Sequence, residues 1–324
     1  MNKMERLSYR VLKRTVWFLS HLPLRPALAL GAGVGSLAFC FMSRRRQIAL
    51  DNVHQAFGKQ MTPQEEKRIV CESFKNLGRI LIEFCRIPRL NSSNLSRLVE
   101  IEGLEKVERS LAKGRGVVLI TAHFGNWELM AQALAVRGYA PRVVVRPMDW
   151  APLEMLVTEI RTALGTKLIS KWQGMAEILS TLRAGEALGI LMDQNTVARE
   201  GVFVDFLGRP ACTTMGVALA AIRTGAPVHS GHIVRLGKGR HRMFFSDEIP
   251  VITTGDLHKD IETNTARFSQ ALESFIRAHP DHWLWLHQRW KTQPADVKIP
   301  SRPVSFSFPL SGKSNGEGGA ERSQ

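Results

Sequence analysis

Residues 4–20 carry apolar side chains at helical spacing. The apolar positions are Leu7, Val11, Leu12, Val16 and Leu19, and between them stand Arg6, Arg10, Lys13 and Arg14. A helix with an apolar side and many cationic residues is typical of a segment that lies on an anionic membrane. Pro23 and Pro26 predict an interruption of the helix after this segment.

A run without formal charge follows, from Pro26 to Ser43, and Arg44-Arg45-Arg46 ends it. Its 18 residues are at the lower limit for a membrane-spanning helix. A triple arginine directly after the apolar region is not typical of a cleaved signal peptide, so residues 1–46 are predicted to be an uncleaved membrane anchor. Because both flanks are basic, charge gives this anchor no orientation. The alternative is a buried core helix rich in Gly and Ala.

Beyond residue 46 the pattern is that of an α/β protein. Thr62-Pro63-Gln64-Glu65 combines a capping Thr, a first-turn Pro and a reciprocal Glu, and therefore predicts a helix start. From residue 116, short β-rich runs alternate with helical ones, which predicts a mostly parallel or mixed central sheet flanked by helices. The predicted strands are 116–121, 141–147, 166–170, 187–193, 227–235 and 241–249, and the predicted helices are 127–137, 152–164, 175–184, 214–224 and 260–278.

The chain is thus predicted to have three parts. Residues 1–46 form the anchor and residues 47–293 form the α/β domain. Residues 294–324 are dominated by Pro, Ser, Gly and charge, which predicts a disordered tail.

The charge of the chain limits the classes of partner that it is expected to bind. Lys and Arg number 44 against 29 Asp and Glu, and the net charge of +15 implies an anionic partner. Residues 1–46 hold nine of the cations and one acid, so +8 belongs to the anchor and +7 to the other 278 residues. The density of positive charge beyond residue 46 is lower than in a nucleic-acid-coating protein. The candidate partners are therefore an anionic membrane or an acidic carrier protein. The four scattered cysteines predict reduced thiols rather than a disulfide framework.

The candidate chemistry follows the first strand of the alternating region. That strand ends in His123, a turn follows at Gly125, Asn126 can cap the next helix, and Glu128 lies in its first turn. Ligands of α/β sheets bind beyond the carboxyl ends of the strands, so His123 is expected to face substrate. It would take a proton from a hydroxyl while Glu128 orients the imidazole. The alternative from spacing alone is a His satisfied by the backbone and a Glu favoured by the helix dipole.

The segment His123–Glu128 resembles the His-x4-acid motif of the bacterial lipid A biosynthesis acyltransferases, of the lysophospholipid acyltransferase superfamily. The likeness runs from about residue 10 to Thr292. Asp205 and Leu207 depart from the family's usual Pro and Phe, which bears on acceptor or acyl-chain preference. Further blocks are similar to the family in the same order: Arg46–Val53 with Phe57-Gly58, Val145-Arg146-Pro147, Met192–Asn195, Gly201–Val204, Phe206–Ala211, and Pro280 with Trp283–His287 and Arg289–Lys291.

This resemblance implies transfer of a fatty acyl group from an acyl carrier protein thioester, or from acyl-CoA, to a hydroxyl of a lipid A precursor or related glycolipid. It implies His123 as general base, Glu128 as its partner and Arg161 as a donor to the thioester oxyanion. Such a transfer requires no metal or cofactor. The resemblance also implies that the protein is bound to a bacterial inner membrane, with its catalytic domain on the cytoplasmic face. The side chains expected to hold the active-site loop or to contact substrate are Asn126, Arg146, Asp193, Gln194 and Arg209.

Two other functions stay open at this point. A glycerophospholipid acyltransferase would share the His-x4-acid chemistry, usually with Asp as the acid, but not the C-terminal Trp-x-Trp-x-His-x-Arg block. A non-catalytic, basic membrane-binding protein would make no use of His123 and Glu128. A zinc site at His279, His282 and His287 is not favoured, because no Cys or acidic partner set completes it.

Overall fold

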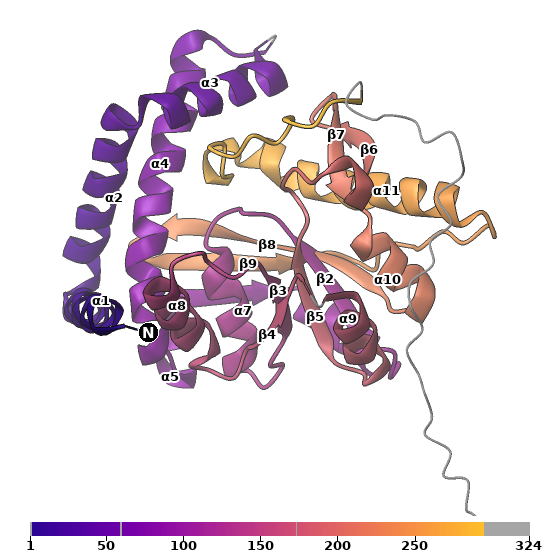
Figure 1. The fold of residues 1–324 in the computed structure, drawn as a ribbon, viewed down its shortest axis with the longest axis horizontal. Helices are drawn as coiled ribbons and strands as arrows, with labels where there is room; N and C mark the ends of the chain where they lie inside the picture. The colour runs from indigo at the N-terminus through magenta and orange to yellow at the C-terminus, as the bar shows by residue number, and fades with distance from the viewer. Residues whose placement is uncertain (1, 59, 173, 295–324) are drawn as a thin grey trace, which may run out of the picture.

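The computed structural model describes residues 2–58, 60–172 and 174–294 (Figure 1). Residues 295–324, where the disordered tail is predicted, lie outside the described residues. The centre of the molecule is a seven-stranded sheet with the strand order β1-β9-β8-β2-β5-β3-β4. The strands are β1 (Val99–Glu102), β2 (Val117–Thr121), β3 (Arg142–Val145), β4 (Lys167–Ser170), β5 (Ala187–Leu191), β8 (Val228–Gly237) and β9 (Arg240–Phe245).

The sheet is mixed, because β8 and β9 pair antiparallel while the other neighbours pair parallel. The predicted fold class is therefore confirmed. The sequence pattern does not predict β1, which is only four residues long. It also does not predict the separate antiparallel hairpin of β6 (Gly201–Phe206) and β7 (Arg209–Thr214).

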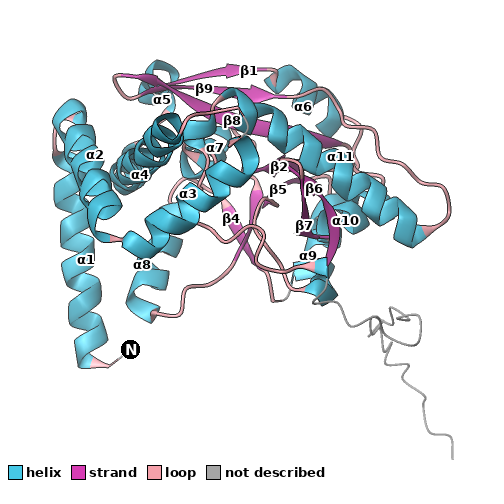
Figure 2. Ribbon diagram, turned by 90° about the horizontal axis from the view of Figure 1, so that it is seen from above, coloured by secondary structure: helices cyan, strands magenta, loops and turns pink. Residues whose placement is uncertain are grey.

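Helices cover both faces of the sheet (Figures 1 and 2). Every residue of β2 is buried, and its side chains alternate between the faces. Val118 and Ile120 belong to the cluster built with α9, α10 and α11, whereas Val117 and Leu119 belong to the cluster built with α5, α6 and α7. The bounds of these helices are α5 (Ser92–Leu98), α6 (Leu104–Leu111), α7 (Trp127–Val136), α9 (Gly174–Arg183), α10 (Gly216–Thr224) and α11 (Leu257–Ala278).

The N-terminal helices form one side of the molecule. In both views α1 (Lys3–His21) and α2 (Leu24–Phe41) lie on the outer margin, with α4 (Pro63–Arg86) and α8 (Ala151–Thr162) between them and the sheet (Figures 1 and 2). α3 (Ser43–Phe57) joins α2 to α4. Thr62 caps α4 through the predicted reciprocal contact with Glu65. The domain boundary at residue 46 stays a prediction, and the structure adds that the helices before it are packed on α4 and α8.

The segment after α11 crosses beside the carboxyl end of β2. The backbone N–H of Leu284 donates to the carbonyl of His123 at 3.0 Å, and the N–H of Gly125 donates to the carbonyl of His282 at 2.9 Å. Ser73, on α4, donates its hydroxyl to the carbonyl of Trp283 at 2.8 Å. The C-terminal segment therefore connects α4 with the loop that carries His123.

Candidate active site

The loop between β2 and α7 holds His123 in a fixed backbone conformation. Gly125 has a φ of +56°, and a Cβ there would lie 1.7 Å from the carbonyl oxygen of Ile233, so only glycine fits this turn. Asn126 then caps α7, because its side-chain oxygen accepts from the N–H of Leu129 at 3.0 Å. The strand end, the turn and the cap thus follow one another as the sequence predicts.

Asp193 orients the imidazole of His123. It follows β5, the parallel neighbour of β2, so the two side chains meet at one edge of the sheet. The Asp193 carboxylate accepts from Nδ1 of His123 at 2.9 Å, from the His123 backbone N–H at 2.9 Å and from Nε1 of Trp283 at 2.7 Å. Burial opposes the charge of Asp193, but these contacts outweigh it and hold its pKa at about 2.

The protonation of His123 follows from this contact. An ionised carboxylate can only accept, so the proton of a neutral imidazole lies on Nδ1 and the lone pair lies on Nε2. The Nε2 atom is 3.3 Å from the amide nitrogen of Gln194, which can donate to it. His123 therefore presents Nε2 as a basic nitrogen, and the neutral amide of Gln194 lies against it.

His123, Glu128, Arg161 and Gln194 line a cavity of about 1000 Å³. The cavity extends along apolar side chains of β2, β3, β5, α7, α9 and α10. A mostly apolar cavity of this volume, with a basic nitrogen in its wall, can hold a hydrocarbon chain whose polar end lies at His123.

Glu128 has a different partner from the predicted one. Its carboxylate accepts from Nε of Arg161 at 3.0 Å and from Nη2 at 2.5 Å, and Nε1 of Trp127 donates to it at 3.2 Å. Both side chains are mostly buried, at 13% and 21% exposed. Burial lowers the pKa of Arg161, but the bond to Glu128 outweighs that effect and raises it. The acid predicted to orient His123 and the arginine predicted to bind an oxyanion thus form an ion pair with each other.

Asn126 connects the loop to α4 rather than to the cavity. Its amide donates to the buried carboxylate of Glu83 at 2.7 Å. Arg235 donates to both oxygens of that carboxylate at 2.6 and 2.7 Å, and His241 lies at 3.0 Å. Burial favours the neutral acid, but the two basic side chains lower the pKa of Glu83 to about 2. Asn126 is therefore a support of the loop.

The remaining predicted arginines lie in different places. Arg146 lines the cavity as an exposed side chain, 3.5 Å from Asp149. Arg209 lies on the β6–β7 hairpin, with its guanidinium 5.4 Å from the centre of the Trp290 ring, and it does not line the cavity. The structure thus places Arg146 where substrate can reach it and Arg209 where it packs against an aromatic ring.

The C-terminal block supplies residues that the sequence did not place in the site. His287 lines the cavity, and its Nε2 accepts from the backbone N–H of Asn195 at 3.0 Å; burial lowers the pKa of His287 to about 4. Arg289 is fully buried, and it donates to the carbonyls of Cys212 and Gln194 at 2.8 and 3.3 Å. With Trp283 they fix the segment 193–195 beside His123. The sequence contained these residues as a block that resembles the family, but the spacing of the block did not show which residues they contact.

In the described part of the chain, no group of three or more His, Cys, Asp and Glu residues could hold a metal ion.

Comparison with known proteins gives the family. A family model described as bacterial lipid A biosynthesis acyltransferase matches residues 8–292. The lipid A biosynthesis lauroyltransferase of Escherichia coli K12 is 29% identical over 292 residues, 89% of this chain and 92% of that protein. The palmitoleoyltransferase of the same strain is 26% identical over 282 residues, 86% and 89% of the two chains. A phosphatidylinositol mannoside acyltransferase of Mycobacterium tuberculosis is 29% identical over 229 residues, 68% and 70% of the two chains. This chain belongs to the bacterial lipid A biosynthesis acyltransferase family, and it is an acyltransferase.

Proposed function

We propose that the protein transfers a fatty acyl group from a thioester donor to a hydroxyl of a lipid A precursor or related glycolipid at a membrane surface, with His123 as general base. One observation carries the proposal. The Nδ1 atom of His123 is held by the buried carboxylate of Asp193, while Nε2 meets Gln194, and His123 and Gln194 both line a mostly apolar cavity large enough for an acyl chain. Glycolipid acceptors are named for relatives from two groups of bacteria, which favours a glycolipid over a glycerophospholipid.

The reaction needs one base and one place for negative charge. Nε2 of His123 takes the proton of the acceptor hydroxyl, and the oxygen attacks the thioester carbonyl. The tetrahedral oxyanion collapses, the carbon–sulfur bond breaks, and the thiolate takes the proton back from the imidazolium. The products are an ester and a free thiol. Asp193 stabilises the imidazolium between these steps, because it carries a negative charge beside Nδ1.

The structure changes the part that Glu128 plays in this proposal. Its charge is already compensated by Arg161, so it cannot gain much from a positive imidazole. We assign it to hold Arg161 at the cavity wall. We assign the stabilisation of the oxyanion to Arg161, which lines the same cavity as His123, and to the amide of Gln194, which lies at Nε2 of His123. The acceptor hydroxyl takes the place of the Gln194 amide at Nε2, and the amide becomes free to donate to the oxyanion.

The donor and the membrane meet a basic surface. Three cations, Arg146, Lys171 and Arg199, are exposed among the residues that line the cavity, beside one exposed acid, Glu200, which pairs with Arg199 at 3.6 Å. An acidic acyl carrier protein can bind there through exposed charge pairs, which act mainly on the rate of encounter and are screened by salt. Activity with carrier-bound donor is expected to fall more steeply with salt than activity with acyl-CoA. Equal salt dependence of the two activities would contradict carrier binding.

The experiment for the activity uses two histidine variants. Purified protein is assayed for transfer of acyl groups from carrier protein or acyl-CoA to a lipid A precursor, with the product identified by mass spectrometry. His123→Ala is expected to lower turnover by about 10²–10⁴-fold. His258→Ala, at an exposed position in the first turn of α11, is the matched control and is expected to be fully active. Normal turnover by folded His123→Ala would refute the proposal.

A further inference from the structure

The helix α2 is, among the described residues, the one helix long and apolar enough to cross a membrane. Only 28% of its apolar stretch is buried, so α2 is not a core helix of a soluble protein. Its exposed large side chains form one stripe, Leu30, Val34, Leu37 and Phe41, at spacings of four, three and four residues. This apolar stripe is not covered by the rest of the protein. A membrane could cover it in two ways, with α2 either crossing the bilayer or lying in its surface.

The opposite side of α2 is fixed to α4 by backbone-to-backbone contact. A Cβ on Gly35 would lie 2.2 Å from the carbonyl oxygen of Phe74, and a Cβ on Gly31 would lie 2.5 Å from that of Gly78. A Cβ on Gly78 would in turn lie 2.0 Å from the carbonyl oxygen of Gly31. Such an approach is available only to glycine, and it binds α2 to α4 through the middle of the helix.

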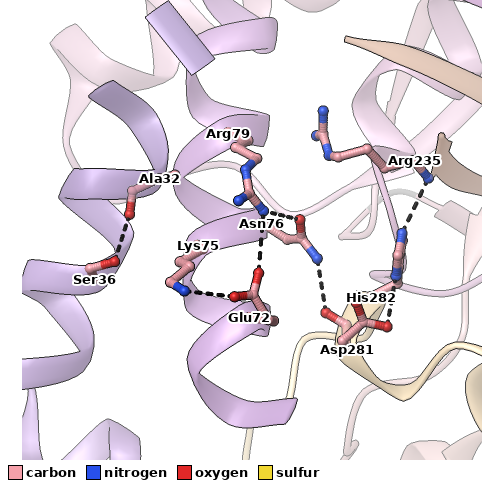
Figure 3. Close-up of polar contacts among 9 residues, drawn as sticks. All are labelled: Ala32, Ser36, Glu72, Lys75, Asn76, Arg79, Arg235, Asp281 and His282. Atoms are coloured by element: carbon pink, nitrogen blue, oxygen red, sulfur yellow. Dashed lines mark hydrogen bonds and ion pairs between the residues drawn. The ribbon is translucent and has the colours of Figure 1, made fainter. Parts of the chain in front are cut away.

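The neighbouring part of α4 is charged. Lys75 lies at the level of Gly35, since a Cβ on that glycine would be 2.7 Å from the Cα of Lys75. Glu72 pairs with Lys75 at 2.6 Å and with Arg79 at 3.6 Å, and all three side chains are partly exposed. Figure 3 shows this ion cluster on α4, between α2 and the C-terminal segment. If α2 crossed a bilayer, α4 would carry these charges to the depth of the hydrocarbon, where ionised side chains are costly.

The first helix adds a second stripe on the same outer margin. Leu12, Val16 and Leu19 face the body, and Tyr9 donates its hydroxyl to Glu159 on α8 at 2.5 Å. The exposed large side chains of α1 are Met4, Leu7, Val11, Trp17 and Phe18. The predicted single apolar face of α1 is therefore two faces, one packed on the protein and one open.

Charge complementarity indicates what covers this margin. Residues 1–46 hold nine Lys and Arg and one acid. Arg25 precedes the apolar stripe of α2 and Arg44 follows it, both exposed. A spanning helix would place these cations on opposite sides of the membrane, whereas a helix parallel to the surface places both at anionic headgroups.

We propose that α1 and α2 lie together in the surface of an anionic bilayer, with their exposed stripes in the acyl region, and that α2 does not cross it. The proposal rests on the membrane location in the proposed function and specifies its geometry. It places α8 between the bilayer-bound α1 and the cavity, because Glu159, which α1 contacts, and Arg161, which lines the cavity, lie two residues apart on α8 and so face opposite sides of it.

The depth of α2 in a bilayer tests this geometry. Leu30, Val34, Leu37 and Phe41 are replaced one at a time by a spin-labelled Cys in the full chain, after Cys40→Ala and Cys71→Ala remove the accessible thiols. The variants bind vesicles of phosphatidylethanolamine and phosphatidylglycerol, and depth is measured from collisions with oxygen and with a water-soluble nickel complex. A label at Arg183, exposed on α9, is the control and is expected to remain in water.

All four labels are expected at a similar, shallow depth. A spanning helix would instead separate Leu30 and Phe41 by about 16 Å along the membrane normal, with the deepest label between them. That profile, or shielding of all four labels in a dimer, would overturn the proposal. Transfer activity of the same variants in detergent separates the outcomes, since loss of activity with a flat depth profile concerns the proposed function alone.

A glycine pair tests the contact with α4 independently. Gly35→Ala is expected to lower Tm by roughly 2–6 °C, because its methyl group meets the carbonyl of Phe74. Gly33→Ala, two residues away with nothing within 4 Å of its Cβ, is the matched control and is expected to keep or raise Tm. Equal Tm values for the two variants would show that α2 is free of α4, and would overturn the proposal.

Discussion

Asp193 and Glu128 are both carboxylates of the active-site region, but they differ in what they bind before any reaction takes place. Asp193 is 2% exposed and accepts hydrogen bonds from His123 twice and from Trp283 once, all neutral donors when the imidazole is neutral. Glu128 accepts from the guanidinium of Arg161, so its charge is already compensated. Only Asp193 gains a counter-ion when His123 takes a proton. Transition-state stabilisation through the imidazole therefore belongs to Asp193, because it strengthens as the reaction proceeds.

The largest expected effect comes from Asp193→Asn, which we expect to lower kcat by about 10²–10⁴-fold. The amide can donate to Nδ1, which moves the imidazole proton to Nε2 and removes the free base. The KM for the acceptor is expected to change little, since Asp193 does not line the cavity. Steady-state kinetics together with Tm check this. An Asn variant within tenfold of the wild type would assign Asp193 to structure alone.

The second expected effect, from Glu128→Gln, is smaller, at roughly 10–100-fold in kcat. The variant leaves the mostly buried Arg161 without its partner, so Tm is also expected to fall. Adding Arg161→Gln to Glu128→Gln is expected to restore part of Tm, because no unpaired cation is then left. The size of the loss in kcat separates the two acids. Asp193→Asn is expected to lower kcat more than Glu128→Gln, whereas an equal loss in both variants would support the orienting role that the spacing of Glu128 predicts.

The same contrast shows how far the sequence could predict this site. The run of four apolar residues from Val117 to Ile120 predicted β2, and Gly125 with Asn126 predicted the turn and the helix after it. Four residues of separation made Glu128 a plausible partner for His123, but the cap at Asn126 starts a helix whose first turn presents Glu128 to α8. Asp193 is 70 residues away, and its contact depends on β5 lying next to β2 with two strands of the chain order skipped. Strand order is set by tertiary packing, which local patterns do not contain.

The fold shows a similar limit. Mostly buried strands such as β2 and β5 follow from the pattern, because a buried strand of a parallel sheet reads as a nearly continuous apolar stretch. β1 alternates Val and Ile with Glu over four residues, too short a pattern to separate from a loop. The β6–β7 hairpin turns at Leu207 and Gly208, both with positive φ, and Leu is an unusual residue for that conformation. Only Gly208 therefore matched the residue types that usually predict such a turn.

The third prediction concerns stability and pH. The pKa of Asp193 is about 2 in the folded protein against an ordinary 3.8, so its ionised form stabilises the fold above about pH 4. That contribution, about 2 kcal/mol, is expected to disappear as the pH falls from about 4 to about 2. Glu83, also at about 2, adds to the slope in the same range. Denaturant unfolding of Asp193→Asn is expected to show a weaker pH dependence than the wild type. Asp149→Asn, at a 93% exposed side chain, is the control and is expected to keep the wild-type slope.

The smallest expected effect tests one of the three bonds to Asp193 by a pair of tryptophan variants. Trp283 and Trp285 are both fully buried, but Nε1 of Trp283 donates to Asp193 whereas Nε1 of Trp285 donates to the carbonyl of Pro280. Replacement of either by Phe leaves a comparable cavity, so the losses of Tm are expected to be similar. A hydrogen bond to a charged group is worth roughly 1.5–3 kcal/mol, and only part of that differs between ground state and transition state. Trp283→Phe is therefore expected to lower kcat by about 2–10-fold more than Trp285→Phe. Equal kcat values at equal Tm losses would mean that the backbone and imidazole of His123 hold Asp193 in place without the indole of Trp283. The C-terminal segment would then support the His123 loop only through its backbone.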